Sequence, residues 1–146
     1  MNLSDQVSYP ALIGTATVPV ALTTAYTANT SKVAIRFMPN VNISGTYTPG
    51  SGSTNSYMSL LIETSEDGST WAPRPVISST ATAILDYAEA VPIQIPGDLT
   101  STASTAISYG YQDTIAAKWM RVSVKETVGG GGAAGTAWLQ VAASAN

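Results

Sequence analysis

The sequence contains neither cysteine nor histidine, and these two absences exclude several kinds of chemistry. Without cysteine, a disulfide, a thiolate metal site and a cysteine nucleophile are impossible. Without histidine, the chain lacks the usual general base, the usual proton shuttle and the commonest metal ligand. A serine nucleophile would need lysine or another base, which is uncommon. The composition therefore predicts a protein that is not an enzyme and that uses no metal or other cofactor.

Charged residues are also scarce, at 10% of the chain with a net charge of −3. Typical globular domains carry roughly 25% charged residues. Phosphate binding needs clustered lysine and arginine, whereas the 6 basic residues are spread along this chain, so we expect no nucleic-acid partner. A freely diffusing monomer usually has a more charged surface. The low charge favours a protein docked in an assembly over a soluble monomer with a hydroxyl-rich surface.

The sequence has no apolar run of about 18 residues, so we expect no transmembrane helix and no membrane partner. Residues 1–19 lack a basic stretch followed by a strongly apolar one, so we expect no signal peptide and synthesis in a host cytoplasm. The length of 146 residues predicts one domain. We expect residues 1–16 to form an irregular N-terminal arm, since Pro10 and Gly14 interrupt any element there, and residues 17–146 to form a single domain.

Apolar residues recur with a period of two, and helix signals are almost absent. The strongest segment is 57–64, in which Met58, Leu60 and Ile62 share one face. Short segments of this kind, separated by Gly, Pro, Asn and Ser, predict an all-β protein. We expect an antiparallel β-sandwich, jelly-roll-like or immunoglobulin-like, with about seven or eight strands. The other segments expected to be extended are 17–27, 32–38, 41–43, 82–95, 106–111, 119–128 and 136–143.

Alternation also predicts which side chains point into the core. In 32–38, Val33, Ile35 and Phe37 are expected to share one face. Met120, Val122 and Val124 in the segment 119–128, and Leu139 and Val141 in the last segment, are expected to point inward. The glycine-rich segments 45–56 and 129–135 are expected to be a mobile loop and a hairpin tip.

Residues 64–71, TSEDGSTW, have two interpretations. Their acidic groups suggest a calcium loop, but the ligand spacing of an EF-hand is absent. The alternative is a hairpin turn in which Asp67 bonds to its own backbone and Gly68 supplies the positive φ of a tight reversal. The spacing favours the hairpin.

Two tyrosines and a tryptophan are candidate surface aromatics. Tyr109 and Tyr111 lie on the same side of an expected strand, and an exposed pair, with Trp71, would offer a platform for sugar rings. The alternative is ordinary core and sheet packing, in which aromatics bury a large area.

An enzyme is the second rival, most plausibly a glycosidase, which needs two carboxyl groups facing each other across a cleft. Nothing in the spacing of the acidic residues selects such a pair. The candidates are Glu63, Glu66, Asp67, Asp86, Glu89, Asp98 and Asp113.

Three stretches resemble the small β-sandwich proteins of tailed-phage virions: residues 44–48, the segment LIETSEDGSTW at 61–71, and KWMRVSV at 118–124. The resemblance covers residues 44–144. It implies a decoration (cement) protein that stabilises the capsid surface by binding the major capsid protein and self-associates as a dimer or trimer. A minor tail or fibre component is also within the resemblance. Because the S-x-D-G-x-x-W element also occurs in sugar-binding sandwiches, a carbohydrate-binding module is the alternative.

The same resemblance gives the N-terminal arm a role, because decoration proteins often use a terminal arm to reach a neighbouring subunit. Strand pairing by the arm would bury Val7, Tyr9, Leu12 and Ile13 against a partner. The alternative is a terminus that frays.

Overall fold

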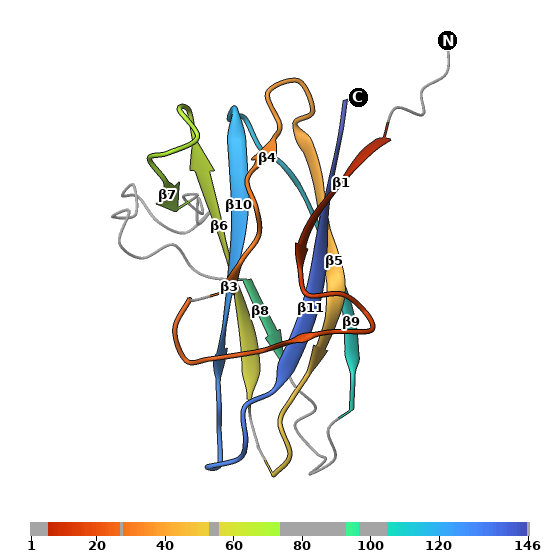
Figure 1. Ribbon diagram of the computed structural model, residues 1–146, viewed down its shortest axis with the longest axis vertical. Helices are drawn as coiled ribbons and strands as arrows, with labels where there is room; N and C mark the ends of the chain where they lie inside the picture. Colours follow the sequence, from red (N-terminus) through yellow and green to blue (C-terminus); the bar gives the residue numbers. More distant parts are fainter. Residues whose placement is uncertain (1–5, 27, 53–55, 74–92, 97–104, 146) are drawn as a thin grey trace, which may run out of the picture.

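In the computed structural model, the described residues are 6–26, 28–52, 56–73, 93–96 and 105–145, with the backbone alone described for 6–11, 28–29 and 93–96 (Figure 1). Within these ranges the chain is all-β, and its strands form two antiparallel sheets. No helix in this part of the chain has the length and apolar character needed to cross a bilayer. The predicted β-sandwich is confirmed.

The first layer, which we call the β5 sheet, has the strand order β1-β11-β5-β9. A short strand, β2 (Val20–Ala21), also pairs with β11. The four main strands are β1 (Gln6–Ile13), β11 (Thr136–Ser144), β5 (Asn40–Thr48) and β9 (Ile107–Thr114).

The second layer, which we call the β6 sheet, has the strand order β3-β10-β6-β7. In addition, β4 pairs with β10 and β8 pairs with β6. Its strands are β3 (Ala28–Asn29), β10 (Trp119–Thr127), β6 (Tyr57–Ser65), β7 (Ala72–Pro73), β4 (Val33–Ala34) and β8 (Ile93–Pro96).

The core lies between the two sheets and is built by alternation along the long strands. Side chains of β5, β6, β10 and β11 that point inward are buried as one cluster. This confirms the inward direction predicted for Met58, Leu60, Ile62, Met120, Val122, Val124, Leu139 and Val141. The pattern works because successive side chains of a strand point to opposite faces of a sheet.

Two predicted loops differ in the structure. Strand β5 continues to Thr48, so residues 45–48 belong to a strand, and Gly45 pairs with Leu139 on one side and Tyr109 on the other. Residues 129–135 do not close a hairpin, because β10 lies in the β6 sheet and β11 in the β5 sheet. This segment carries the chain from one layer to the other.

The segments 17–27 and 32–38, predicted to be extended, form only two-residue strands. The chain crosses between layers here: β2 pairs with β11, whereas β3 and β4 pair with β10. The inward prediction holds for Val33 and Ile35 but is wrong for Phe37, which is 76% exposed. Backbone N–H of Met38 donates to the carbonyl of Ile35 at 2.9 Å, and this turn ends the alternation. Of the predicted segment 82–95, residues 82–92 lie outside the described residues.

The predicted irregular arm is partly wrong, because residues 6–13 form strand β1 at the edge of the β5 sheet. Strand β1 pairs antiparallel with β11, and the register shifts between Val7 and Ala11. Pro10 has no N–H to donate, which is compatible with an edge strand that contains an irregularity. Gly14, at a φ of 60°, makes the turn that follows.

Candidate binding surfaces

The outer face of the β5 sheet presents aligned rows of small and polar side chains. Alternate residues of β11, β5 and β9 stand directly opposite one another across the sheet. Successive rows consist of Ser144, Asn40 and Thr114; then Ala142, Asn42 and Gln112; then Gln140, Ser44 and Gly110.

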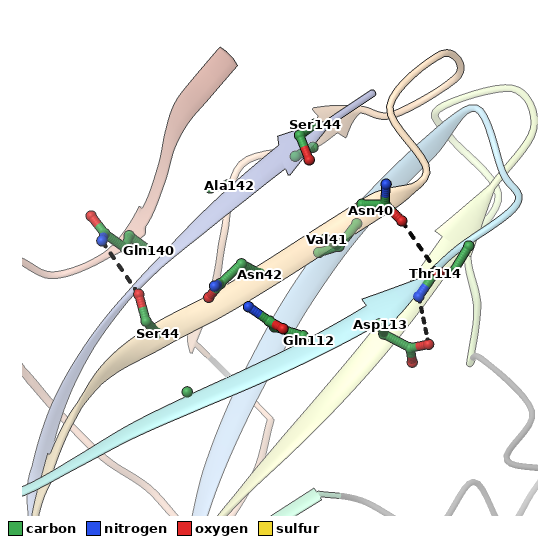
Figure 2. A pocket seen from close by; sticks show the side chains of 12 residues that line it. Asn40, Val41, Asn42, Ser44, Gln112, Asp113, Thr114, Gln140, Ala142 and Ser144 are labelled. Atoms are coloured by element: carbon green, nitrogen blue, oxygen red, sulfur yellow. Dashed lines mark hydrogen bonds between the residues drawn. The ribbon is translucent and has the colours of Figure 1, made fainter. Parts of the chain in front are cut away.

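These rows line a shallow hollow of about 590 Å³ (Figure 2). Its lining is dominated by amides, hydroxyls and small residues, and Asp113 is the only charged residue among the described ones that contribute. Asp113 Oδ2 accepts a hydrogen bond from the hydroxyl of Tyr111 at 2.5 Å, and Oδ1 accepts one from the backbone N–H of Thr114 at 2.7 Å. The hollow therefore offers hydrogen-bond donors and acceptors but only one charged group.

The polar groups of the hollow are only partly engaged with one another. Gln140 Nε2 donates to Ser44 Oγ at 3.3 Å, and Thr114 Oγ1 donates to Asn40 Oδ1 at 3.3 Å. Between these two pairs lie Asn42 and Gln112, whose side chains form no hydrogen bond with any described residue. The middle of the hollow thus holds two amides with donors and acceptors to offer.

The outer face of the β6 sheet is different, because its charges are paired with one another. Arg121 Nε and Nη2 donate to the two carboxylate oxygens of Glu63 at 2.7 and 3.1 Å, and Ser123 Oγ donates to the same carboxylate at 3.2 Å. The guanidinium of Arg121 also lies 4.6 Å from the ring centroid of Trp71. A two-bond arginine–carboxylate pair that stacks on an indole is held in one geometry.

The lysines beside this sheet are also engaged. The Nζ atom of Lys32 lies 4.9 Å from the ring centroid of Trp119, and the Nζ atom of Lys125 lies 4.8 Å from the ring centroid of Tyr26. Lys118 Nζ is 3.4 Å from a carboxylate oxygen of Glu66. Each of these three lysines therefore already has a partner on its own surface.

Residues 64–71 form the predicted hairpin turn, which joins β6 to β7. Asp67 Oδ1 accepts from the backbone N–H groups of Ser69 and Thr70, both at 2.7 Å, and from Ser65 Oγ at 3.0 Å. These bonds hold the pKa of Asp67 well below its usual range, because they favour the charged carboxylate. Gly68 has a φ of 73°, as the tight reversal requires. The carboxylate of Asp67 therefore forms its hydrogen bonds within its own turn.

The predicted aromatic platform is not present. Tyr109 and Tyr111 do share one side of β9, as predicted, but that side faces the core, against which both rings pack. The hydroxyl of Tyr109 donates to the carbonyl of Trp138 at 3.4 Å. Trp71 is half-buried and lies against Arg121. Alternation showed that the two tyrosines are on the same side, but only sheet packing decided that this side is the inner one.

Leu12 and Ile13, the two predicted arm residues whose side chains are described, point in different directions. Ile13 is 3% exposed and belongs to the protein's own core, whereas Leu12 is 38% exposed and stands opposite Gln140. Val7 pairs through its backbone with Ala143. Tyr9 lies in β1, and the side chains of Val7 and Tyr9 are outside the described residues. Neighbours on a strand point to opposite faces, so Leu12 and Ile13 lie on opposite sides of the β5 sheet.

Sequence reasoning missed two residues. Phe37 is exposed in the loop between β4 and β5, with the Arg36 guanidinium 5.1 Å from its ring centroid. The proline at position 39 could have indicated that the strand ends before Phe37, since a proline restricts the residue that precedes it. Glu126 is 1% exposed and points into the core from β10. The sequence could have indicated that Glu126 is buried, because it lies two residues after Val124 and so shares the inward face of the strand.

Among the residues that the structure describes, the carboxylates do not form a glycosidase pair in the hollow. Glu63 bonds to Arg121, Asp67 bonds to its own turn, and Asp113 is the single carboxylate in the lining. Asp86, Glu89 and Asp98 lie outside the described residues. The required arrangement of two facing carboxyl groups is not found in this surface.

Alkaline pH is expected to destabilise the protein. Burial raises the pKa of Tyr109, and burial together with Glu126 raises the pKa of Tyr47. In the unfolded chain a tyrosine releases its proton near pH 10, so above about that pH the folded state binds more protons and its stability falls. Urea unfolding at neutral pH and above about pH 10 should show this loss, reduced in Tyr109→Phe. Equal pH slopes for wild type and variant would contradict the assignment.

Comparisons with known proteins add little to this description. No protein-family model matches the chain, and no curated protein matches it. Among solved structures it is similar to dimeric latent PorU from Porphyromonas gingivalis, at 13% sequence identity and a TM-score of 0.42. The match covers 97% of this chain and 12% of that chain. A similarity this distant carries no argument about function.

Proposed function

We propose that this chain is a non-enzymatic structural protein that decorates the capsid of a tailed phage and stabilises it by binding the major capsid protein. The observation that carries the proposal is Phe37, a large apolar side chain that is 76% exposed in a protein with few charges. The resemblance of residues 44–144 to virion β-sandwich proteins supports the choice of partner. Self-association as a dimer or trimer on the particle belongs to the same proposal.

The loop that carries Phe37 is well placed to make a contact. It connects β4 to β5 and lies at one end of the sandwich (Figure 1). Arg36 stacks beside the ring, so the tip presents an aromatic and an arginine together. Aromatic and arginine side chains are enriched among the residues that dominate binding energy at interfaces. Full burial of one phenylalanine side chain contributes about 1.5–3 kcal/mol.

A capsid repeats such a contact many times. Each copy needs to bury only about 1,000 Å² for a specific interface, and the remainder of the interface can come from uncharged surface that is inexpensive to dehydrate. Repetition over the shell then raises the pressure that the shell withstands. A single exposed apolar residue is not unusual by itself, so the proposal is tested at Phe37 against a similarly exposed residue elsewhere.

Phe37→Ala is expected to weaken binding to undecorated phage heads by about 2 kcal/mol or more, as expected of a dominant interface residue. The measurement is co-sedimentation with heads assembled from the major capsid protein encoded by the same genome. The matched control is Val18→Ala, because Val18 is 69% exposed but lies in a different loop. Both variants should keep the wild-type free energy of unfolding within about 0.5 kcal/mol, since both side chains are exposed.

Two outcomes would contradict this proposal. Wild-type protein that remains in the supernatant at all concentrations would remove the capsid partner. Equal binding by wild type, Phe37→Ala and Val18→Ala would remove the role of the β4–β5 loop.

A further inference from the structure

We propose that the hollow on the outer face of the β5 sheet binds a neutral oligosaccharide. The residues that line the hollow do not include Phe37, so this site is separate from the capsid contact. The protein would thus have one surface for the particle and a second for a glycan.

The chemistry of the lining selects a ligand rich in hydroxyl groups. The side chains of Asn42 and Gln112 each offer donors and an acceptor, and the hydroxyl of Ser44, which accepts from Gln140, can still donate. Sugar hydroxyls likewise donate and accept, so each can be matched by such groups. The described lining holds no lysine or arginine to neutralise a phosphate, sulfate or carboxylate, and it holds one carboxylate that would repel them. The ligand is therefore neutral.

The centre of the hollow is open and unsatisfied. Asn42 and Gln112 stand opposite each other there, and neither amide bonds to a described side chain (Figure 2). Ala142 lies beside Asn42 in the same row, and it is too small to cover these amides. Gly110 borders them on β9, where even an added Cβ would meet no atom within 4 Å. Two amides with small neighbours leave room for a ring above the sheet.

The size of the hollow suits a short chain of sugars. Residues two apart on a strand are about 6.5–7 Å apart, so the rows together span about 13 Å along the strands. The volume of about 590 Å³ lies within the usual range for ligand sites. At one end, Trp138 occupies the next outward position of β11, opposite Thr46, and is half-buried. Its indole supplies an apolar surface on which the flat face of a terminal sugar can rest.

Asp113 follows Tyr111 by two residues and so belongs to the opposite phase of β9 from Gln112, which leaves it at the edge of the hollow as a negative charge only. Each of its carboxylate oxygens already accepts one hydrogen bond, from Tyr111 or from the Thr114 backbone. These bonds hold the carboxylate apart from the amides of Asn42 and Gln112.

The test is affinity electrophoresis of the whole chain in gels that contain dextran, mannan or galactan, with polygalacturonate as the anionic comparison. Retardation is expected in at least one of the neutral gels and not in polygalacturonate. Asn42→Ala and Gln112→Ala are each expected to weaken binding about three- to tenfold, the effect of one net hydrogen bond. Ala142→Arg, which fills the hollow with a long side chain, is expected to abolish retardation.

Two control variants separate this site from other effects. Thr127→Ala changes an exposed residue of β10 on the other sheet and is expected to leave retardation unchanged. Phe37→Ala is also expected to bind the glycan as wild type does, so loss of capsid binding and loss of glycan binding are distinguishable. Circular dichroism of each variant confirms that the fold is retained.

Several results would overturn the proposal. These are no retardation in any neutral gel, retardation in polygalacturonate alone, or wild-type retardation of Ala142→Arg. Sedimentation velocity gives a further check, because a dimer that Ala142→Arg dissociates would show that a second copy of the chain occupies the hollow.

Discussion

Replacing Glu126 with alanine is expected to lower the free energy of unfolding by about 4 kcal/mol, because each donor left unsatisfied costs about 1–3 kcal/mol and the missing side chain leaves a cavity. Glu126 is 1% exposed and points inward from β10. Its Oε1 accepts from the hydroxyl of Tyr47 on β5 at 2.6 Å, and its Oε2 accepts from the backbone N–H of Gly135 at 2.6 Å. The carboxylate therefore connects the two sheets through buried hydrogen bonds.

The donor role of Tyr47 follows from its surroundings. Burial raises its pKa, and the hydrogen bond to Glu126 and the negative charge of Glu126 raise it further. The hydroxyl therefore keeps its proton at any ordinary pH. Tyr47→Phe is expected to be milder than Glu126→Ala, because it leaves one carboxylate oxygen short of a partner but keeps the bond to Gly135.

Urea unfolding followed by tryptophan fluorescence gives both values, and the double variant measures the coupling between them. The control is Thr127→Ala, at the next and exposed position of β10, where the change should stay within about 0.5 kcal/mol. A loss below about 1 kcal/mol for Glu126→Ala, less than one unsatisfied donor costs, would contradict the buried network.

Gly45→Ala is expected to destabilise the protein by about 3 kcal/mol, at the upper end of the usual effect of overpacking. A Cβ at Gly45 would lie 2.1 Å from the carbonyl oxygen of Trp138 and 2.8 Å from the Cα of Leu139. Both are backbone atoms of β11, so the clash cannot be relieved by rotating a side chain. The β5–β11 pairing must shift instead.

Gly110→Ala is the matched control, since Gly110 lies on β9 opposite Ser44, the neighbour of Gly45. An added Cβ there meets nothing within 4 Å. This substitution is expected to be neutral or to stabilise by up to about 1 kcal/mol, because alanine restricts the unfolded chain more than glycine does. Urea unfolding and amide exchange of the β5–β11 pairs distinguish the two variants. Equal effects at both glycines would show that the close approach of β11 is not the cause.

The candidate binding face could be predicted only in fragments. Polar residues alternate along two segments of the sequence, at Asn40, Asn42 and Ser44 in one and at Gln140 and Ser144 in the other. That these phases form one surface depends on β5 lying between β11 and β9. Nothing local in the sequence specifies this order, because the paired residues are 96 positions apart for Ser44 and Gln140 and 74 positions apart for Asn40 and Thr114.

The wrong predictions for residues 129–135 and for Phe37 have related causes. Residues 129–135 carry the glycines of a hairpin tip, yet they join two layers, because β10 pairs with β6 and β11 pairs with β5. Phe37 continues the inward phase of Val33 and Ile35, but the chain turns before it. A period-two pattern gives the face of a residue only while the strand lasts, and it does not show where the strand ends.

The sequence alone determined that the protein is all-β and which apolar phase of β6, β10 and β11 lies in the core. This was possible because alternation is a local property of an extended backbone and the apolar phase must be buried. The tertiary structure decided which strands are neighbours, and so it made β1 part of the β5 sheet, placed the Glu126 carboxylate between the layers, turned Tyr109 and Tyr111 inward and assembled the hollow. These features depend on non-local pairing, whose partners are chosen by the packing of the whole molecule.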